Sequence, residues 1–161
     1  MKRRNFLMAM TAMLASPLIV YRVNAGMKGE TVTNDFQLSD AQWRERLSKA
    51  QYHILRKEGT EPSGSSALND EKRDGVYACA GCDLELFTSA MKYDSGTGWP
   101  SFYAVIADRI ATKTDYKLFF PRTEYHCARC GGHQGHVFDD GPKPTGLRYC
   151  NNGLALNFIP A

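Results

Sequence analysis

Cys79-Ala-Gly-Cys82 and Cys127-Ala-Arg-Cys130 are two Cys-x-x-Cys pairs, and 44 residues separate them. Four cysteines at this spacing are typical of a structural zinc site, in which every ligand is a thiolate and no position is open for chemistry. Disulfides or a redox-active Cys-x-x-Cys are the alternatives, but adjacent sulfurs reach one metal ion without strain. One structural Zn²⁺ is therefore predicted to hold two distant parts of the chain together. Its predicted ligands are Cys79, Cys82, Cys127 and Cys130.

The fifth cysteine lies outside these pairs, in Arg148-Tyr-Cys150-Asn-Asn152. A thiol beside a guanidinium is a candidate nucleophile, because the positive charge favours the thiolate. If this segment is extended, Arg148 and Cys150 share one face. The alternative is an inert buried thiol, which free cysteines commonly are.

Two further features carry side chains suited to chemistry. His133-Gln-Gly-His136 places two imidazoles three residues apart, and histidine exchanges protons near neutral pH. A glycine-flanked loop, residues 96–102, offers the indole of Trp99. Each feature also has a structural explanation: the histidines can be surface or hydrogen-bonded residues, and Trp99 can fill the core.

Residues 1–25 have the pattern of a signal peptide. A basic start, Lys2-Arg-Arg4, precedes an uncharged and mostly apolar run from Phe6 to Tyr21, and Val23-Asn-Ala25 supplies the small residues of a cleavage site. The run is shorter than the ~18–20 residues that span a bilayer, which favours cleavage over a retained anchor. The start also resembles a twin-arginine signal, so we expect export, to the periplasm or beyond, without stable membrane insertion.

The formal charge of the chain without residues 1–25 excludes nucleic acid as a partner. Removing residues 1–25 takes away four basic residues, which leaves 16 against 17 acidic ones, so the formal charge falls from +3 to −1. A nucleic-acid-binding surface would need a basic excess. The predicted organisation is a linker over residues 26–37 and one catalytic domain over residues 38–161, acting as a monomer.

The mature chain begins with a helical pattern and continues with short β-like runs. Ser39 and Gln42 form a capping box for a helix predicted from Ser39 to Lys57, with Gly59 just past its end. The fold is therefore predicted to be mainly β, with an N-terminal helical part. The predicted strands are Val76–Cys79, Leu84–Phe87, Tyr103–Ile106, Tyr116–Phe120, Glu124–Cys127, His136–Phe138 and Leu154–Ile159.

The order of motifs over roughly residues 38–159 resembles the B-type methionine sulfoxide reductases. The motifs that carry the resemblance, besides the two cysteine pairs, are Tyr93-Asp-Ser-Gly96-x-Gly98-Trp99-Pro-Ser-Phe102, Arg122-Thr-Glu124, His133-x-Gly135-His136-Val-Phe138, Asp140-Gly-Pro142 and Arg148-Tyr-Cys150-x-Asn152.

The resemblance implies a fold of two antiparallel sheets and the reduction of methionine-R-sulfoxide in peptides and proteins. Cys150 would be the nucleophile and would become a sulfenic acid. No flavin or nicotinamide site is needed. The resemblance implies further roles. His133 and His136 would supply a proton to the sulfoxide oxygen, and Arg148 would stabilise the thiolate. Asn152 and Asp140 would organise hydrogen bonds, and Trp99 would form an apolar wall for the methyl group.

This chain departs from many relatives at Thr97, where they carry a cysteine that resolves the sulfenic acid. With the other four cysteines committed to zinc, we expect an external thiol or a thioredoxin-like reductant to restore Cys150. The competing classes are a zinc-ribbon binding module, a zinc hydrolase or deaminase with His133 and His136 as ligands, and a dithiol oxidoreductase. The charge and the absence of their signatures weigh against them.

Overall fold

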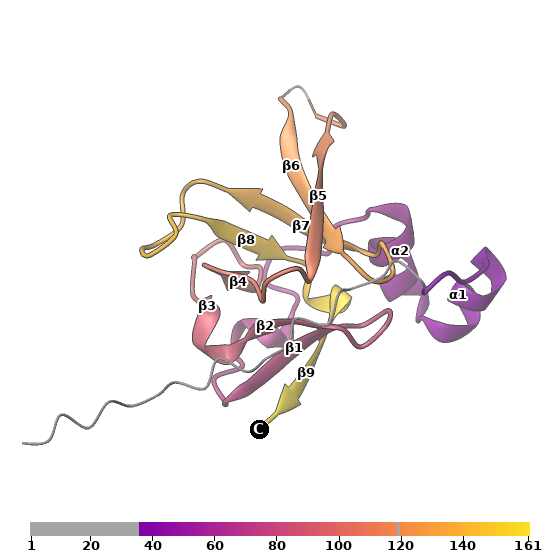
Figure 1. The fold of residues 1–161 in the computed structure, drawn as a ribbon, viewed down its shortest axis with the longest axis horizontal. Coiled ribbons are helices and arrows are strands. Elements are labelled where there is room, and N and C mark those ends of the chain that lie inside the picture. The colour runs from indigo at the N-terminus through magenta and orange to yellow at the C-terminus, as the bar shows by residue number, and fades with distance from the viewer. Residues whose placement is uncertain (1–35, 119) are drawn as a thin grey trace, which may run out of the picture.

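The computed structural model describes residues 36–118 and 120–161, so the predicted signal peptide and most of the predicted linker lie outside the described residues. Two antiparallel sheets with two α-helices on the N-terminal side make up the described chain, which confirms the predicted mainly β fold (Figure 1). Over the same residues, no helix combines the length and the apolar character needed to cross a membrane.

The smaller sheet has three strands in the order β2-β1-β9, and the larger has six in the order β3-β4-β8-β7-β6-β5. The strands of the smaller sheet are β1 (Gly75–Cys79), β2 (Glu85–Thr88) and β9 (Leu156–Pro160). Those of the larger sheet are β3 (Lys92–Tyr93), β4 (Ser101–Phe102), β5 (Ile110–Asp115), β6 (Arg122–Cys127), β7 (His133–Phe138) and β8 (Arg148–Asn151). Three single 3-10 turns complete the elements: η1 (Ala67–Asn69), η2 (Ser89–Met91) and η3 (Gly153–Ala155).

Aromatic side chains fill the space between the two sheets. Phe87 of the smaller sheet stacks on Phe102 of the larger one with ring centroids 4.0 Å apart, and Tyr77 meets Phe102 edge-on at 5.0 Å. These three rings are fully buried, and burying a side chain of this kind stabilises the fold by roughly 1.5–3 kcal/mol. Because Phe102 belongs to β4, this packing fixes the strand that runs beside Cys150.

The single helix predicted for Ser39–Lys57 is wrong, because the structure divides it into α1 (Asp40–Arg46) and α2 (Lys49–Lys57). The Ser39 capping box is confirmed, and Ser48 forms a second capping box that starts α2. The break lies at Leu47, which is extended and buried. The second helix ends at Glu58, whose φ of 53° is left-handed, rather than at a glycine.

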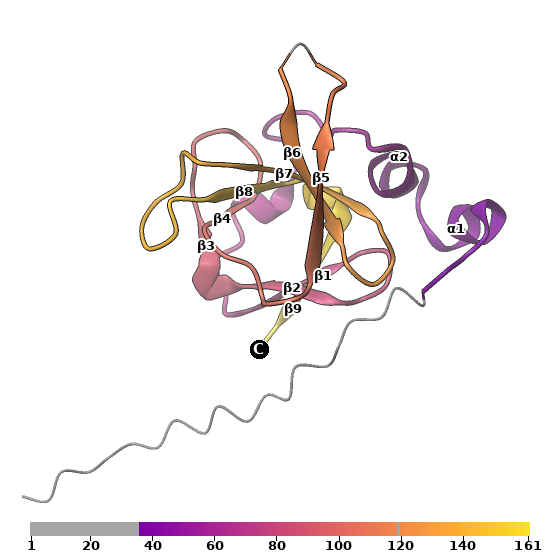
Figure 2. The ribbon, with the colours of Figure 1, turned by 45° about the horizontal axis from the view of Figure 1, so that its top comes forward.

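Both helices hold the loops that carry the cysteine pairs. Arg46 at the end of α1 donates from Nε to the carbonyl oxygen of Gly81 at 2.7 Å. Arg56 in α2 donates to the carbonyl oxygen of Cys130 at 2.9 Å and lies over the ring of the buried Trp43. Figure 2 places α1 and α2 together on one side of the sheets, next to these loops.

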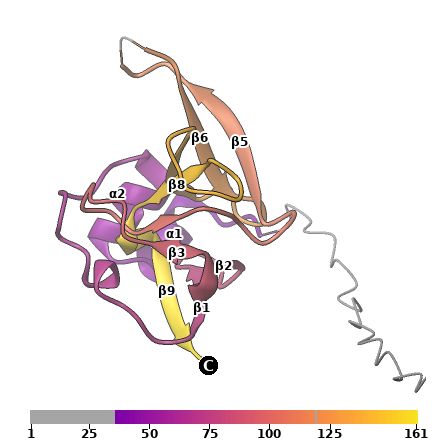
Figure 3. The ribbon, with the colours of Figure 1, turned by 90° about the vertical axis from the view of Figure 1, so that its left-hand side faces the viewer.

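Strands β5 and β6 form a hairpin that projects from the body of the molecule (Figures 1 and 3). The strand predicted for Tyr116–Phe120 is wrong, because its described residues, 116–118 and 120, lie between β5 and β6 at the tip of the hairpin. Its described apolar side chains, Tyr116, Leu118 and Phe120, are 77%, 59% and 80% exposed. The strand predicted for Tyr103–Ile106 is wrong as well, because this segment is a loop between β4 and β5.

Candidate active site and cysteine cluster

The two Cys-x-x-Cys pairs form matching turns at the ends of β1 and β6. In each turn the residue after the second cysteine adopts a left-handed conformation, Asp83 at φ 60° and Gly131 at φ 68°. Its N–H returns to the carbonyl oxygen of the first cysteine, at 2.8 Å for Cys79 and 2.9 Å for Cys127. Both turns therefore present two sulfurs in the same direction.

The four cysteine sulfurs meet in one buried cluster. They lie within 4.8 Å of one another; the Sγ atoms of Cys79 and Cys130 are 3.7 Å apart, and those of Cys82 and Cys127 are 3.5 Å apart. A tetrahedral zinc site with bonds of ~2.3 Å requires sulfurs about 3.8 Å apart. The donor set and its spacing therefore fit a metal ion.

Cys150 lies on β8, a central strand of the larger sheet. The register places Ser101 of β4 opposite Cys150 on one side and His136 of β7 opposite it on the other. Residues directly opposite in a ladder share one face of the sheet, so these side chains converge. Gly135 permits this close pairing, because a Cβ atom there would lie 1.9 Å from the carbonyl oxygen of Cys150.

Opposing influences act on the Cys150 thiol. Burial raises its pKa, and this outweighs the charge of Arg148 and a hydrogen bond from Thr97, which both lower it. Arg148 is shared, because Asp140 accepts two hydrogen bonds from its guanidinium at 2.7 and 2.8 Å. The Cys150 thiol is therefore protonated at neutral pH, whereas the sequence pattern favoured a thiolate.

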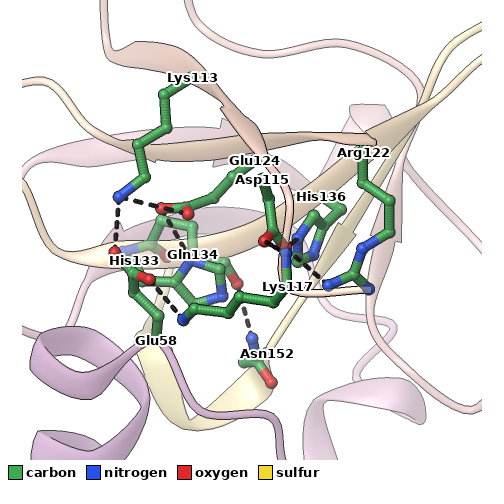
Figure 4. A network of polar contacts seen from close by, with 10 residues as sticks. All are labelled: Glu58, Lys113, Asp115, Lys117, Arg122, Glu124, His133, Gln134, His136 and Asn152. Atoms are coloured by element: carbon green, nitrogen blue, oxygen red, sulfur yellow. Dashed lines mark hydrogen bonds and ion pairs between the residues drawn. The ribbon is translucent and has the colours of Figure 1, made fainter. Parts of the chain in front are cut away.

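Each predicted histidine lies beside a buried carboxylate (Figure 4). His136 Nε2 is 2.7 Å from Oδ2 of Asp115, and His133 Nδ1 is 3.0 Å from Oε1 of Glu124, although that ring is not aligned for a hydrogen bond. Burial lowers the pKa of both imidazoles more than the carboxylates raise it. Both histidines are therefore neutral at pH 7.

A pocket of about 290 Å³ opens beside Cys150. Trp99 lines it, with its indole N–H donating to the carbonyl oxygen of Glu61 at 3.1 Å. Asn152 also lines it, and its side chain donates to the carbonyl oxygen of Gln134 at 3.0 Å. The other residues that line the pocket are Thr60, Thr97, Arg122, Gly135, His136, Phe138, Arg148 and Asn151.

The structure thus brings most of the predicted site residues together. Cys150, His136, Arg148, Asn152 and Trp99 line one pocket. Two predicted residues stand apart from it: Asp140 contacts Arg148 instead of lining the pocket, and His133 is only 2% exposed and does not line it either. The role of His133 beside the sulfoxide oxygen stays a prediction.

Comparison with known proteins identifies the family. Residues 47–160 match the SelR domain. The chain belongs to the SelR domain family. Among its relatives, "Peptide methionine sulfoxide reductase MsrB" of Methanosarcina barkeri is 54% identical over 121 residues, which cover 74% of this chain and 85% of the relative. Proteins of the same name from Thiobacillus denitrificans and Leptospira interrogans are each 50% identical, over 80% and 74% of this chain and 98% and 92% of theirs.

Sequence reasoning missed the polar residues that support the SelR site from a distance. Asp115 is 7% exposed and binds both His136 and Arg122, the latter at 2.6 Å. Glu124 joins His133 to Lys113, whose Nζ lies 3.4 Å from Oε2 of Glu124. Glu124 stands in a motif that carried the resemblance, but neither carboxylate lies near its histidine in the sequence. Only the pairing of β5, β6 and β7 brings them together.

Proposed function

We propose that this protein reduces methionine-R-sulfoxide in peptides and proteins to methionine, with Cys150 as the nucleophile. The observation that carries the proposal is a thiol on a central strand that opens into a pocket with an indole wall and a neutral histidine directly opposite. Membership of the SelR family, together with relatives named peptide methionine sulfoxide reductase, supports the same activity.

The reaction transfers oxygen from one sulfur to another. The Cys150 sulfur attacks the sulfoxide sulfur and forms an S–S bond. The oxygen then moves to Cys150, so that an S–O bond forms there while the S–O bond of the sulfoxide and the S–S bond both break. The substrate sulfur gains two electrons and leaves as methionine, while Cys150 loses two and becomes a sulfenic acid. The thiol proton ends on the transferred oxygen, so proton and oxygen both balance.

The protonated resting thiol suits this reaction. A sulfoxide oxygen leaves poorly until it is protonated, and the Cys150 thiol can supply that proton. Because His136 is neutral and directly opposite, it is placed to accept this proton and pass it to the oxygen. Arg148 then stabilises the thiolate as it forms, since its charge already acts on that sulfur. Transfer of the thiol proton to the sulfoxide oxygen would be completed only once substrate is bound.

The pocket walls suit the substrate side chain. A protonated sulfoxide carries positive charge at sulfur, and an aromatic face attracts such a charge as well as a methyl group. Trp99 and Phe138 supply aromatic faces. The Arg148 guanidinium also lies 4.3 Å from the centre of the Phe138 ring, so one ring contacts both the pocket and the residue that stabilises the thiolate.

The proposal is tested by incubating the protein with dabsyl-methionine-R-sulfoxide and dithiothreitol, with the S epimer in parallel. We expect turnover of the R epimer alone, because the two epimers exchange the positions of oxygen and methyl between His136 and the aromatic wall. Equal turnover of both epimers, or none of the R epimer by metal-loaded protein, would reject the assignment.

Two partners and a location complete the proposed function. Zn²⁺ bound by Cys79, Cys82, Cys127 and Cys130 would stabilise the fold and, with all positions filled by thiolates, would take no part in the reaction. An external thiol or thioredoxin-like protein would reduce the sulfenic acid to thiol and water. Export to the periplasm or beyond would place the enzyme among oxidised exported proteins, and this part of the proposal rests on residues 1–25.

Replacing Thr97 with cysteine should install an internal resolving thiol. Thr97 and Cys150 line the same pocket, and a disulfide requires Cα atoms within about 7 Å. Its neighbours Gly96 and Gly98 have φ values of 70° and 85°, which glycine adopts without strain, so the loop can adjust. After one turnover without reductant, mass spectrometry should find a disulfide between the introduced thiol and Cys150 in Thr97→Cys.

The unmodified protein should instead hold a dimedone-reactive sulfenic acid at Cys150 after the same single turnover. Thr97→Ser is the matched control, because it keeps a hydroxyl at this position and adds no thiol. An internal disulfide in the unmodified protein would contradict the external-thiol proposal.

A further inference from the structure

Gln134 is the extra residue of a β-bulge in β7. The adjacent residues Tyr125 and His126 of β6 pair with Gly135 and His133, so Gln134 between them has no partner on β6. Without an extra residue, the two histidines of this motif, three positions apart, would point to opposite faces of the sheet. With it they share a face, and the centroids of their rings lie 5.6 Å apart.

The fully buried side chain of Gln134 connects the cysteine cluster with β8. Its Nε2 donates to Cys79 Sγ at 3.3 Å, and its Oε1 accepts from Nδ2 of Asn151 at 3.4 Å. Its main-chain carbonyl oxygen accepts from the backbone N–H of Asn152 at 2.9 Å and from the side chain of Asn152 at 3.0 Å (Figure 4). One residue thus contacts a predicted metal ligand and the two residues that follow Cys150.

The carbonyl oxygen of Asn152 sets the direction of these hydrogen bonds. A carbonyl oxygen can only accept, so the Asn151 amide must present its NH₂ group to it, at 2.8 Å. The same NH₂ group contacts Gln134, so the Gln134 amide must present its oxygen there. The NH₂ group of Gln134 is then left facing Cys79 Sγ as a donor. Tyr125 completes the network by donating to Oδ1 of Asn151 at 2.6 Å.

We propose that Gln134 is a positioning residue that couples the cysteine cluster to the strand of Cys150. At one end its N–H stabilises the thiolate of Cys79, as hydrogen bonds to metal ligands commonly do. At the other end it holds Asn151 and Asn152, which continue the chain directly after the nucleophile. The inference rests on the proposed function for the role of Cys150, and goes beyond it by giving the metal site an effect on that residue.

Burial makes the two ends of this network depend on each other. Gln134, Asn151 and Tyr125 are fully buried, so a lost hydrogen bond leaves a polar group without a partner. If the Gln134 amide turned over, its oxygen would face the sulfur and its NH₂ group would face that of Asn151, which removes both bonds. How well the sulfur accepts therefore affects how firmly Asn151 is held, and the reverse is equally true.

The first test measures the metal end directly. Gln134→Met keeps the length of the side chain and removes its N–H. With Co²⁺ bound in place of zinc, the thiolate-to-metal charge-transfer absorption reports the energy of the sulfur electrons. A hydrogen bond to sulfur lowers that energy, so the band should move to longer wavelength in Gln134→Met. A side chain that only filled space would leave the band in place.

The second test asks whether the effect passes through the network. Asn151 makes no hydrogen bond to the four clustered cysteines within the described residues, yet Asn151→Ala should weaken zinc binding through Gln134. Zinc affinity is measured by competition with EDTA. It should fall by about tenfold in Gln134→Met and by at least about threefold in Asn151→Ala. The double variant should match Gln134→Met, because independent effects would add.

Ser101→Ala is the matched control for the loss of a buried hydrogen bond beside β8. Ser101 is fully buried and lies on β4, the other neighbour of β8. In the part of the chain that the structure describes, its hydroxyl bonds Ser95 and Trp99 and does not contact the network. The zinc affinity and the cobalt band of Ser101→Ala should therefore stay unchanged.

The catalytic end is measured as turnover of methionine-R-sulfoxide by zinc-saturated protein. Gln134→Met should lower kcat by about tenfold, the usual effect of removing a partner of a metal ligand. KM should change little, because Gln134 does not line the pocket.

A shifted cobalt band in Gln134→Met, together with weaker zinc binding in Asn151→Ala, supports the inference. An unmoved band or an unchanged kcat in Gln134→Met overturns it, and so does a zinc affinity in Asn151→Ala equal to that of Ser101→Ala. If Gln134→Met fails to fold, the comparison of the other two variants decides. The cobalt spectrum and the zinc affinity need no sulfoxide, so a coupled cluster in a protein without reductase activity would reject the proposed function alone.

Discussion

We expect Cys150→Ser to eliminate sulfoxide reduction and to leave the fold and the metal content unchanged. A serine oxygen cannot take up a second oxygen and lose two electrons as sulfur does, so the first step has no substitute. We expect turnover to fall by on the order of 10³-fold or more, measured with the R epimer and dithiothreitol. Cys150 is half-buried and outside the cysteine cluster, so the melting temperature should change little.

The unmodified protein and the metal content of the variant provide the controls for this experiment. Circular dichroism and one zinc ion per chain should be the same in both. If Cys150→Ser retained substantial turnover, another residue would be the nucleophile, and the assignment of the pocket would have to be abandoned.

We expect Cys82→Ser to produce the opposite pattern, with a damaged fold as the primary effect. Cys82 is buried in the cluster and lies 3.5 Å from Cys127 across it. Structural zinc contributes folding free energy directly, so losing one of four ligands should cost several kcal/mol and lower the melting temperature by on the order of 10 °C. A chelator should lower the melting temperature of the unmodified protein in the same way.

Each of these two variants is the control for the other, since both replace one cysteine by serine. Elemental analysis should give one zinc ion per chain in the unmodified protein and in Cys150→Ser, and less in Cys82→Ser. Fully active protein without metal would contradict the structural role of the cluster.

Sequence patterns predicted the cysteine cluster because its residues are chemically distinctive and occur as two close pairs. Strand β8, which carries Cys150, was not among the predicted strands. Sequence patterns failed where the apolar character of a residue did not match its burial in the structure. Leu47 is apolar and continues the helical spacing, yet it interrupts the helix, because Ser48 caps a new one. Tyr116 and Phe120 look like strand core but lie exposed at the tip of a hairpin. Apolar character indicates that a side chain can be buried, not that it is.

The polar part of the site was less accessible to prediction. Asp115 contacts His136 across 21 positions of sequence, and no local pattern distinguishes it from an exposed aspartate. Gln134 is a similar case: it is fully buried, and its side chain donates to Cys79 Sγ at 3.3 Å while its carbonyl oxygen accepts from Asn152. Such residues owe their roles to strand pairing, so they become visible only in three dimensions.

The position of Cys150 on a strand paired on both sides also determines the order of events in a catalytic cycle. A sulfur held between β4 and β7 cannot swing out to meet a reductant, so the reductant must enter by the opening that admitted the sulfoxide. Methionine has to leave that opening first. The two half-reactions therefore alternate and never overlap, and the kinetics should be ping-pong, with parallel double-reciprocal lines for sulfoxide and reductant.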